Sequence, residues 1–111
     1  MPLANSATGR LFAAYLPGAV SAPLLKAEFA RMPEAKRGYA ERLEEIRARG
    51  LSRVQGDLQR GVASVAAPVF GHGGGIVAVI AALGPQGGFD VAWDGPIAAA
   101  VQRAARELSG R

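Results

Sequence analysis

Two apolar runs joined by a glycine-rich segment dominate the middle of the chain. Residues 61–70 and 76–85 contain no charged side chain, and the residues between them read Gly-His-Gly-Gly-Gly. Valine and isoleucine favour extended backbone, and glycine supplies the positive φ angles of tight hairpin turns. The pattern predicts two adjacent antiparallel strands. Because alternation with polar residues is nearly absent, we expect both strands to be buried on most of both faces.

Helical spacing of apolar residues predicts two helices near the start of the chain. The first begins at Ser6 or Thr8, since either hydroxyl can accept a hydrogen bond from a free backbone N–H, and it ends before Pro17. The second is capped by Ser21 and ends at Pro33.

A third helix is expected from about Ala35 to Arg49. Tyr39, Leu43 and Ile46 recur at i, i+4 and i+7 and form its buried face. Residues 51–54 then read as a short strand, and residues 55–57 as a turn that leads into the hairpin.

The last helix follows the hairpin and a glycine-rich loop. Asp94 is the predicted N-cap, Pro96 lies in the first turn, and Gly110 ends the helix. The residues expected to face inward are Ile97, Val101, Ala104, Ala105 and Leu108. Helices around an antiparallel sheet of two or three strands define an α+β fold in one domain over residues 1–111. So small a sheet leaves strand edges that a partner chain or a further part of the domain must cover.

Composition excludes several kinds of chemistry. The 111 residues include no cysteine and one histidine, so thiol nucleophiles, disulfides and sites with several histidines are ruled out. We expect no cofactor and no metal. The formal net charge is +4, but acidic residues are interspersed with the basic ones, which favours solvated helix faces over nucleic-acid contact. We find neither a signal peptide nor an apolar run of membrane-spanning length, and expect a cytoplasmic protein without membrane contact.

Three segments carry residues that could support chemistry. The segment at 71–75 lacks the Lys-Ser/Thr of a phosphate loop and the serine elbow of an esterase, so it is predicted to be a hairpin turn with His72 exposed. Asp90 and Asp94 flank Trp93 and could hold a sugar or a cation, but helix capping explains Asp94 more simply. The N–H groups at residues 6–9 suit an anion, and capping explains their hydroxyls equally well.

The order and spacing of several short runs resemble the effector-binding domain of IclR-type bacterial transcriptional regulators. These runs are residues 3–10, Leu-Ala-Asn-Ser-Ala-Thr-Gly-Arg, then 46–51, 66–70 and 79–85, and the closing helix 98–109. The resemblance implies the later portion of a GAF-like (profilin-like) α+β domain. It also implies that the DNA-binding winged helix-turn-helix lies outside this chain, and that the domain forms a homodimer or homotetramer.

The resemblance further implies a pocket for a small-molecule effector between the sheet and the first helix. The lining carried over to this sequence is Ser6, Ala7, Thr8, Gly9, Gln55, Asp57, Ser64, Pro68, Ala81 and Leu83. Family members that bind small carboxylates place an acid, a cysteine and hydroxyls where this chain has Gln55, Pro68, Ala81 and Leu83. Because such a pocket has few donors, we expect an apolar or aromatic organic acid as the effector.

The function expected from the resemblance is effector sensing, without catalysis, that controls DNA binding by the missing N-terminal domain. Two other functions were considered. One is a stand-alone ligand-binding module with no DNA link, and the other is a small hydrolase that uses the loop of His72.

Overall fold

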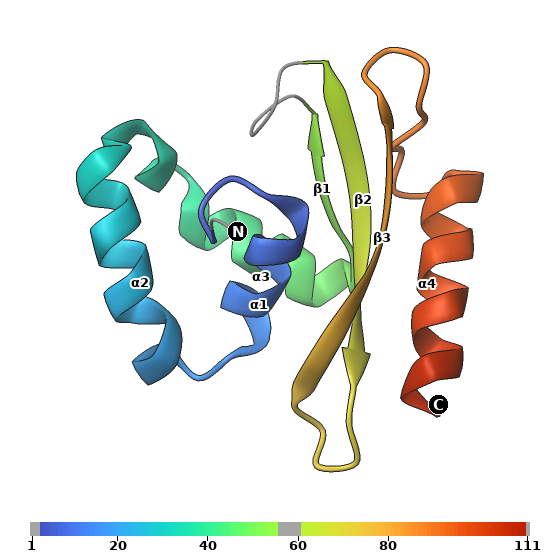
Figure 1. Ribbon diagram of the computed structural model, residues 1–111, viewed down its shortest axis with the longest axis horizontal. Helices are drawn as coiled ribbons and strands as arrows, with labels where there is room; N and C mark the ends of the chain where they lie inside the picture. The colour runs from blue at the N-terminus through green and yellow to red at the C-terminus, as the bar shows by residue number, and fades with distance from the viewer. Residues whose placement is uncertain (1–2, 56–60, 111) are drawn as a thin grey trace.

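The computed structural model describes residues 3–55 and 61–110 as four α-helices, one 3-10 helix and three strands. In chain order these are α1 (Ala7–Tyr15), α2 (Gly18–Arg31), η1 (Pro33–Lys36), α3 (Tyr39–Arg49), β1 (Ser52–Gln55), β2 (Val62–Phe70), β3 (Ile76–Pro85) and α4 (Pro96–Ser109). α1, α2 and α3 lie on one side of the sheet and α4 on the other (Figure 1). The predicted α+β class is therefore confirmed.

The sheet has the order β1-β2-β3, with both pairings antiparallel. β1 pairs with only the first half of β2, from Gln55 opposite Ala63 to Ser52 opposite Ala66. Pro68 therefore lies beyond the end of this pairing, where the N–H group that proline lacks is not needed for a second ladder. β3 pairs along the whole of β2, with one irregularity between Val69 and Phe70.

Each face of β2 belongs to a separate apolar cluster, because successive side chains of a strand point to opposite faces. Ala66 packs with buried residues of α1 and α3, among them Leu11 and Leu43. Ala63, Val65, Ala67 and Val69 pack with α4. β2 is buried along nearly its full length, as the sequence predicted.

β3 corrects the prediction that both strands of the hairpin are buried on both faces. Its residues are half-buried or exposed, and Val77 and Leu83 are 65% and 67% exposed. Among the described residues β3 has a paired neighbour on one side only, so it is an edge strand of this sheet. An apolar run without polar alternation cannot distinguish a central strand from an edge strand.

Two predicted helix starts are also wrong. α2 begins at Gly18, with Pro17 at the N-cap, so Ser21 lies inside the helix and caps nothing. Pro17 has a φ of −55° but a ψ of 140°, so it lies just outside the helix and precedes its first turn. α3 begins at Tyr39 and not at Ala35, because Gly38 adopts a left-handed φ of +70° between η1 and α3.

The last helix ends at Gly110 as predicted but differs from its prediction at the N-cap and at Leu108. Gly95, with extended backbone, occupies the N-cap of α4, while Asp94 is exposed and makes no capping bond. Pro96 opens the first turn as expected. Val101 and Ala105 are buried, but Leu108 is 64% exposed.

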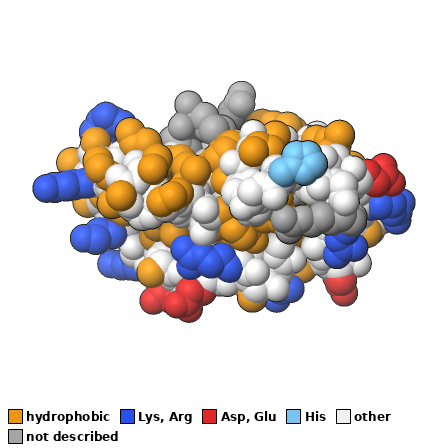
Figure 2. All heavy atoms as spheres, turned by 90° about the horizontal axis from the view of Figure 1, so that it is seen from below, with side chains coloured by type: hydrophobic (Ala, Val, Ile, Leu, Met, Phe, Trp, Pro, Cys, Tyr) orange, Lys and Arg blue, Asp and Glu red, His pale blue; other side chains and the backbone are white. Residues whose placement is uncertain are grey.

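The hairpin turn is confirmed. The N–H of Gly71 donates to the carbonyl of Gly75 at 3.0 Å, and Gly74 has a φ of +85°. His72 is exposed, and Figure 2 shows the imidazole on the surface, away from the clusters of charged side chains.

Candidate functional site

The start of α1 is the most constrained part of the predicted ligand site. Ser6 is the N-cap, and its Oγ accepts a hydrogen bond from the N–H of Gly9 at 2.9 Å. Ser6, Ala7 and Gly9 are buried, and Thr8 is half-buried. Capping, one of the two interpretations left open by the sequence, therefore accounts for Ser6.

Side chains from α2 and α3 hold the backbone that leads into α1. The two carboxylate oxygens of Glu28 accept hydrogen bonds from the N–H groups of Leu3 and Ala4, both at 2.9 Å. The hydroxyl of Tyr39 donates to the carbonyl of Leu3 at 2.7 Å. Arg10 reaches back from α1, and its Nε donates to the carbonyl of Ala4 at 2.9 Å. These bonds fix where the helix N-terminus points.

The pKa of Tyr39, whose hydroxyl helps to hold the start of α1, is shifted by its surroundings. Burial raises the pKa of its phenol from 10.0 to about 12, while Arg10 opposes the shift and Glu28 adds to it. The phenol therefore stays protonated, and keeps its donor, throughout the physiological range.

On the sheet, three of the predicted lining residues lie on the face that α1 covers. Ser64 is opposite Leu83, and Ala81 is opposite Ala66, which packs in the cluster of α1. Directly opposite residues of antiparallel strands share a face, so Ser64, Ala81 and Leu83 all lie on that side. Ser64 is 7% exposed, whereas Leu83 is 67% exposed. The result is a buried hydroxyl beside an accessible apolar surface.

Of the remaining predicted residues, Pro68 lies away from the start of α1. Pro68 lines a separate hollow of about 370 Å³ with Tyr15 and Phe70, at the opposite end of α1 from Ser6. The backbone of Gln55 pairs with Ala63, but its side chain lies outside the described residues. Asp57 and the predicted turn around it also lie outside them.

The surroundings of Trp93 correct the suggestion that it holds a sugar or an external cation. The guanidinium carbons of Arg49 and Arg53 lie 4.8 and 4.3 Å from its ring centroid, so the ring already contacts cations of its own chain. Asp90 accepts a bond from the N–H of Ala92 at 2.9 Å and shapes the loop.

Two arginines also depart from the predicted solvated helix faces. Arg10 is 6% exposed. Arg47 donates from Nε to the carbonyl of Ala14 at 2.8 Å and thereby caps the C-terminal end of α1. Sequence reasoning missed both because their acceptors are backbone carbonyls at positions that only the folded chain brings near.

The described part of the chain contains no group of three His, Cys, Asp or Glu side chains that could hold a metal ion. Within the same residues, no helix combines the length and the apolar character needed to cross a bilayer.

Comparison with known proteins shows the family. The pattern of the family described as "Bacterial transcriptional regulator IclR C-terminal" matches residues 1–110, so the chain belongs to this family. No curated protein sequence matches the chain significantly.

Solved structures agree with this assignment. HmgR of Pseudomonas aeruginosa is 40% identical, with a TM-score of 0.90 over 100% of this chain. Two further structures share its fold. An IclR transcriptional regulator from Alicyclobacillus acidocaldarius has a TM-score of 0.81 over 99% of this chain, at 22% identity. The C-terminal domain of KdgR from E. coli has a TM-score of 0.81 over 98% of this chain, at 23% identity. This chain spans 45% of HmgR, 46% of the Alicyclobacillus protein and 70% of the KdgR domain.

Proposed function

We propose that this chain senses a small-molecule effector in a transcriptional regulator and performs no catalysis. The observation that supports the proposal is the position of α1, which has a tethered N-terminus and packs on the sheet face to which Ser64, Ala81 and Leu83 belong. An N-terminus held by four bonds from three side chains, next to apolar surface, is a preorganised place for a ligand with one anionic group.

The proposed effector is an apolar or aromatic organic acid. Its carboxylate would lie toward the start of α1, residues 6–9, and its apolar body against Ala81 and Leu83. The hydroxyl of Ser64 supplies a polar anchor beside this apolar surface. Gln55, Asp57 and Pro68 belong to the proposed lining through the resemblance alone.

The proposed response is a change in subunit arrangement. A ligand that binds one arrangement of a homodimer or homotetramer more tightly than another shifts the equilibrium toward it, and thereby moves attached DNA-binding domains. Because the chain matches the C-terminal part of a regulator family and spans 45% of HmgR, we assign DNA contact to another domain of the regulator, and we place the regulator in the cytoplasm.

Calorimetric titration of the chain tests the ligand class. We expect an aromatic acid such as phenylacetate to bind more tightly than pyruvate.

Leu83→Asp places a carboxylate against the ligand body and should weaken binding at least tenfold, whereas His72→Ala, at the exposed hairpin tip, should leave it unchanged. Tighter binding of pyruvate would overturn the aromatic preference. Ester hydrolysis that disappears in His72→Ala would overturn sensing in favour of the hydrolase.

A further inference from the structure

The outermost helix, α2, leaves most of its apolar side chains exposed (Figure 1). Its buried residues are Ser21 and Glu28, while Val20 and Leu24 are 51% and 54% exposed. The exposed apolar residues of the helix are Ala19, Val20, Ala22, Pro23, Leu24, Ala27 and Ala30. A surface helix normally turns charged and polar residues to solvent, and a helix that is apolar on most sides is normally buried. The outward side of α2 therefore has the character of a contact surface.

A shallow hollow of about 520 Å³ lies between α2 and η1 on this surface. Leu25 and Phe29 are half-buried in it, and the ring of Phe29 packs edge-on against Tyr39 with the ring centroids 5.3 Å apart. The other lining residues are Ala22, Lys26, Ala30, Pro33 and Lys36. Pockets for small molecules enclose most of the ligand, so a shallow hollow suits one face of a larger partner.

The charges around this hollow are mostly positive. The exposed charged residues of α2, η1 and the residues up to Gly38 are Lys26, Arg31, Glu34, Lys36 and Arg37. Figure 2 shows hydrophobic side chains gathered on the side of the molecule where α2 lies, with Lys and Arg side chains at the edge. An apolar centre with a charged rim is the anatomy of a protein interface, and a positive rim attracts an acidic partner.

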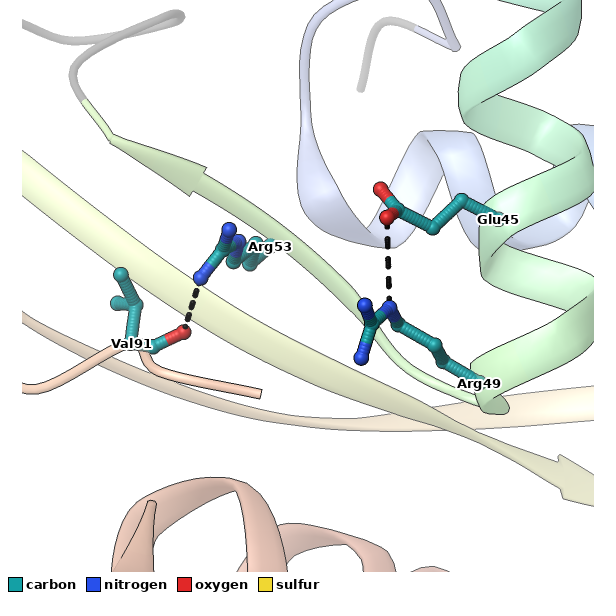
Figure 3. A network of polar contacts seen from close by, with 4 residues as sticks. All are labelled: Glu45, Arg49, Arg53 and Val91. Carbon is teal, nitrogen blue, oxygen red and sulfur yellow. Dashed lines mark hydrogen bonds and ion pairs between the residues drawn. The ribbon is translucent and has the colours of Figure 1, made fainter. Parts of the chain in front are cut away.

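The cations of the neighbouring elements are already engaged within the chain. Arg49 pairs with Glu45 at 3.3 Å, and Arg53 donates to the carbonyl of Val91 at 2.9 Å (Figure 3). Within the part of the chain that the structure describes, Lys26 and Lys36 have no such ion pair. Both ammonium groups are therefore available to carboxylates of a partner.

A second copy of this chain is a poor match for the surface. All the cations of the segment lie from Lys26 onward, and residues 18–25 carry no charge. Two antiparallel α2 helices would place the basic half of each against the uncharged half of the other. Such a pair adds positive charge without carboxylates to balance it, which disfavours the contact.

We propose that α2 and η1 dock an acidic amphipathic helix of a separate protein. The apolar side chains of that helix, spaced at i, i+3, i+4 and i+7, would lie on Leu25, Phe29 and the exposed alanines. Its Glu or Asp side chains would meet Lys26 and Lys36. The regulator would gain a protein contact that is separate from the effector site proposed at the start of α1.

A fluorescently labelled synthetic peptide tests this surface. The probe is an amphipathic helix with leucine at i, i+3, i+4 and i+7 and glutamate on its polar face. We expect saturable binding to the chain, measured by fluorescence anisotropy, that weakens as salt is added. The same peptide with lysine in place of glutamate should not bind. Equal binding of the two peptides, or binding of neither, would overturn the proposal.

Variants locate the binding. Lys26→Glu combined with Lys36→Glu should weaken binding of the acidic peptide at least tenfold. Arg103→Glu combined with Arg106→Glu, on the exposed side of α4, changes the net charge equally and should leave binding nearly unchanged. Ala30→Glu puts a larger, acidic side chain into the hollow at an exposed helical position and should also weaken binding. Equal binding by the two charge-reversed variants would overturn the proposal.

Three further measurements distinguish the other occupants. Self-association of the chain that is lost in Ala30→Glu, measured by sedimentation, would assign the surface to a second copy. Tighter binding to phosphatidylglycerol vesicles than to the peptide would assign it to a membrane. Failure of the intact regulator to bind the peptide would show that another of its domains covers α2. Each of these results would overturn the proposal. Because Leu83→Asp should retain peptide binding, this surface and the effector site can fail separately.

Discussion

The carboxylate of Glu28 accepts a hydrogen bond from the backbone N–H of Leu3 across 25 positions of sequence. Its second oxygen accepts from Ala4, so one buried side chain of α2 satisfies two consecutive N–H groups ahead of α1. The start of α1 is therefore positioned by the outermost helix of the fold (Figure 1).

Glu28→Gln should destabilise the protein. An amide offers one acceptor oxygen, and its NH₂ would meet a backbone donor, so one buried N–H loses its partner. We expect a loss of about 1–3 kcal/mol in the free energy of unfolding, measured by urea denaturation. Glu44→Gln on the exposed face of α3 is the matched control and should change stability by less than about 0.5 kcal/mol. Equal losses of stability in the two variants would contradict the role of Glu28 in holding the start of α1.

Tyr39 should make stability fall at high pH. Its pKa is about 12 in the folded protein and 10.0 in the unfolded chain, so the folded state binds more protons between these values. The free energy of unfolding therefore decreases as pH rises through 10 and levels off above about 12. Burial also raises the pKa of Tyr15, which adds in the same direction. Tyr39→Phe should show a smaller decrease in pH-dependent urea denaturation, and an unchanged decrease would contradict this account.

Gly84→Ala should disrupt the end of β3. A Cβ at this position would overlap the ring of Phe89 and lie 2.9 Å from its Cβ, so the loop that carries Phe89 has to move. Forced overpacking of this kind costs about 1–3 kcal/mol. Gly73→Ala in the hairpin turn, where a Cβ meets open space, is the control. Thermal unfolding should separate the two variants, with Gly84→Ala melting lower.

α4 offers a test of which of its apolar residues face the sheet. Val101 is 6% exposed, and Val101→Ala should cost about 2 kcal/mol through lost burial and a residual cavity. Leu108 is 64% exposed, and Leu108→Ser should change the free energy of unfolding by less than about 0.5 kcal/mol. A large loss of unfolding free energy in Leu108→Ser alone would show that another surface covers this end of α4.

Local chemistry of the sequence was sufficient for several elements. Ser6 caps α1 and Gly50 ends α3 because both interactions lie within one helical turn. The glycines at 71–75 form the predicted turn for the same reason. The buried face of α3, with Tyr39 and Ile46, follows from its spacing alone. In the candidate site, the capped start of α1 was predictable on this basis, because the bond from the N–H of Gly9 to Ser6 is local.

The tertiary structure decided whatever depends on partners far apart in the chain. β3 and β2 have similar apolar sequences, yet neighbours on both sides bury β2, and β3 is left as an edge. Nothing near Glu28 in the sequence indicates that its acceptors serve Leu3 and Ala4. The contacts of Trp93 with Arg49 and Arg53 have the same origin, since burial and electrostatic fields sum over all neighbours in space.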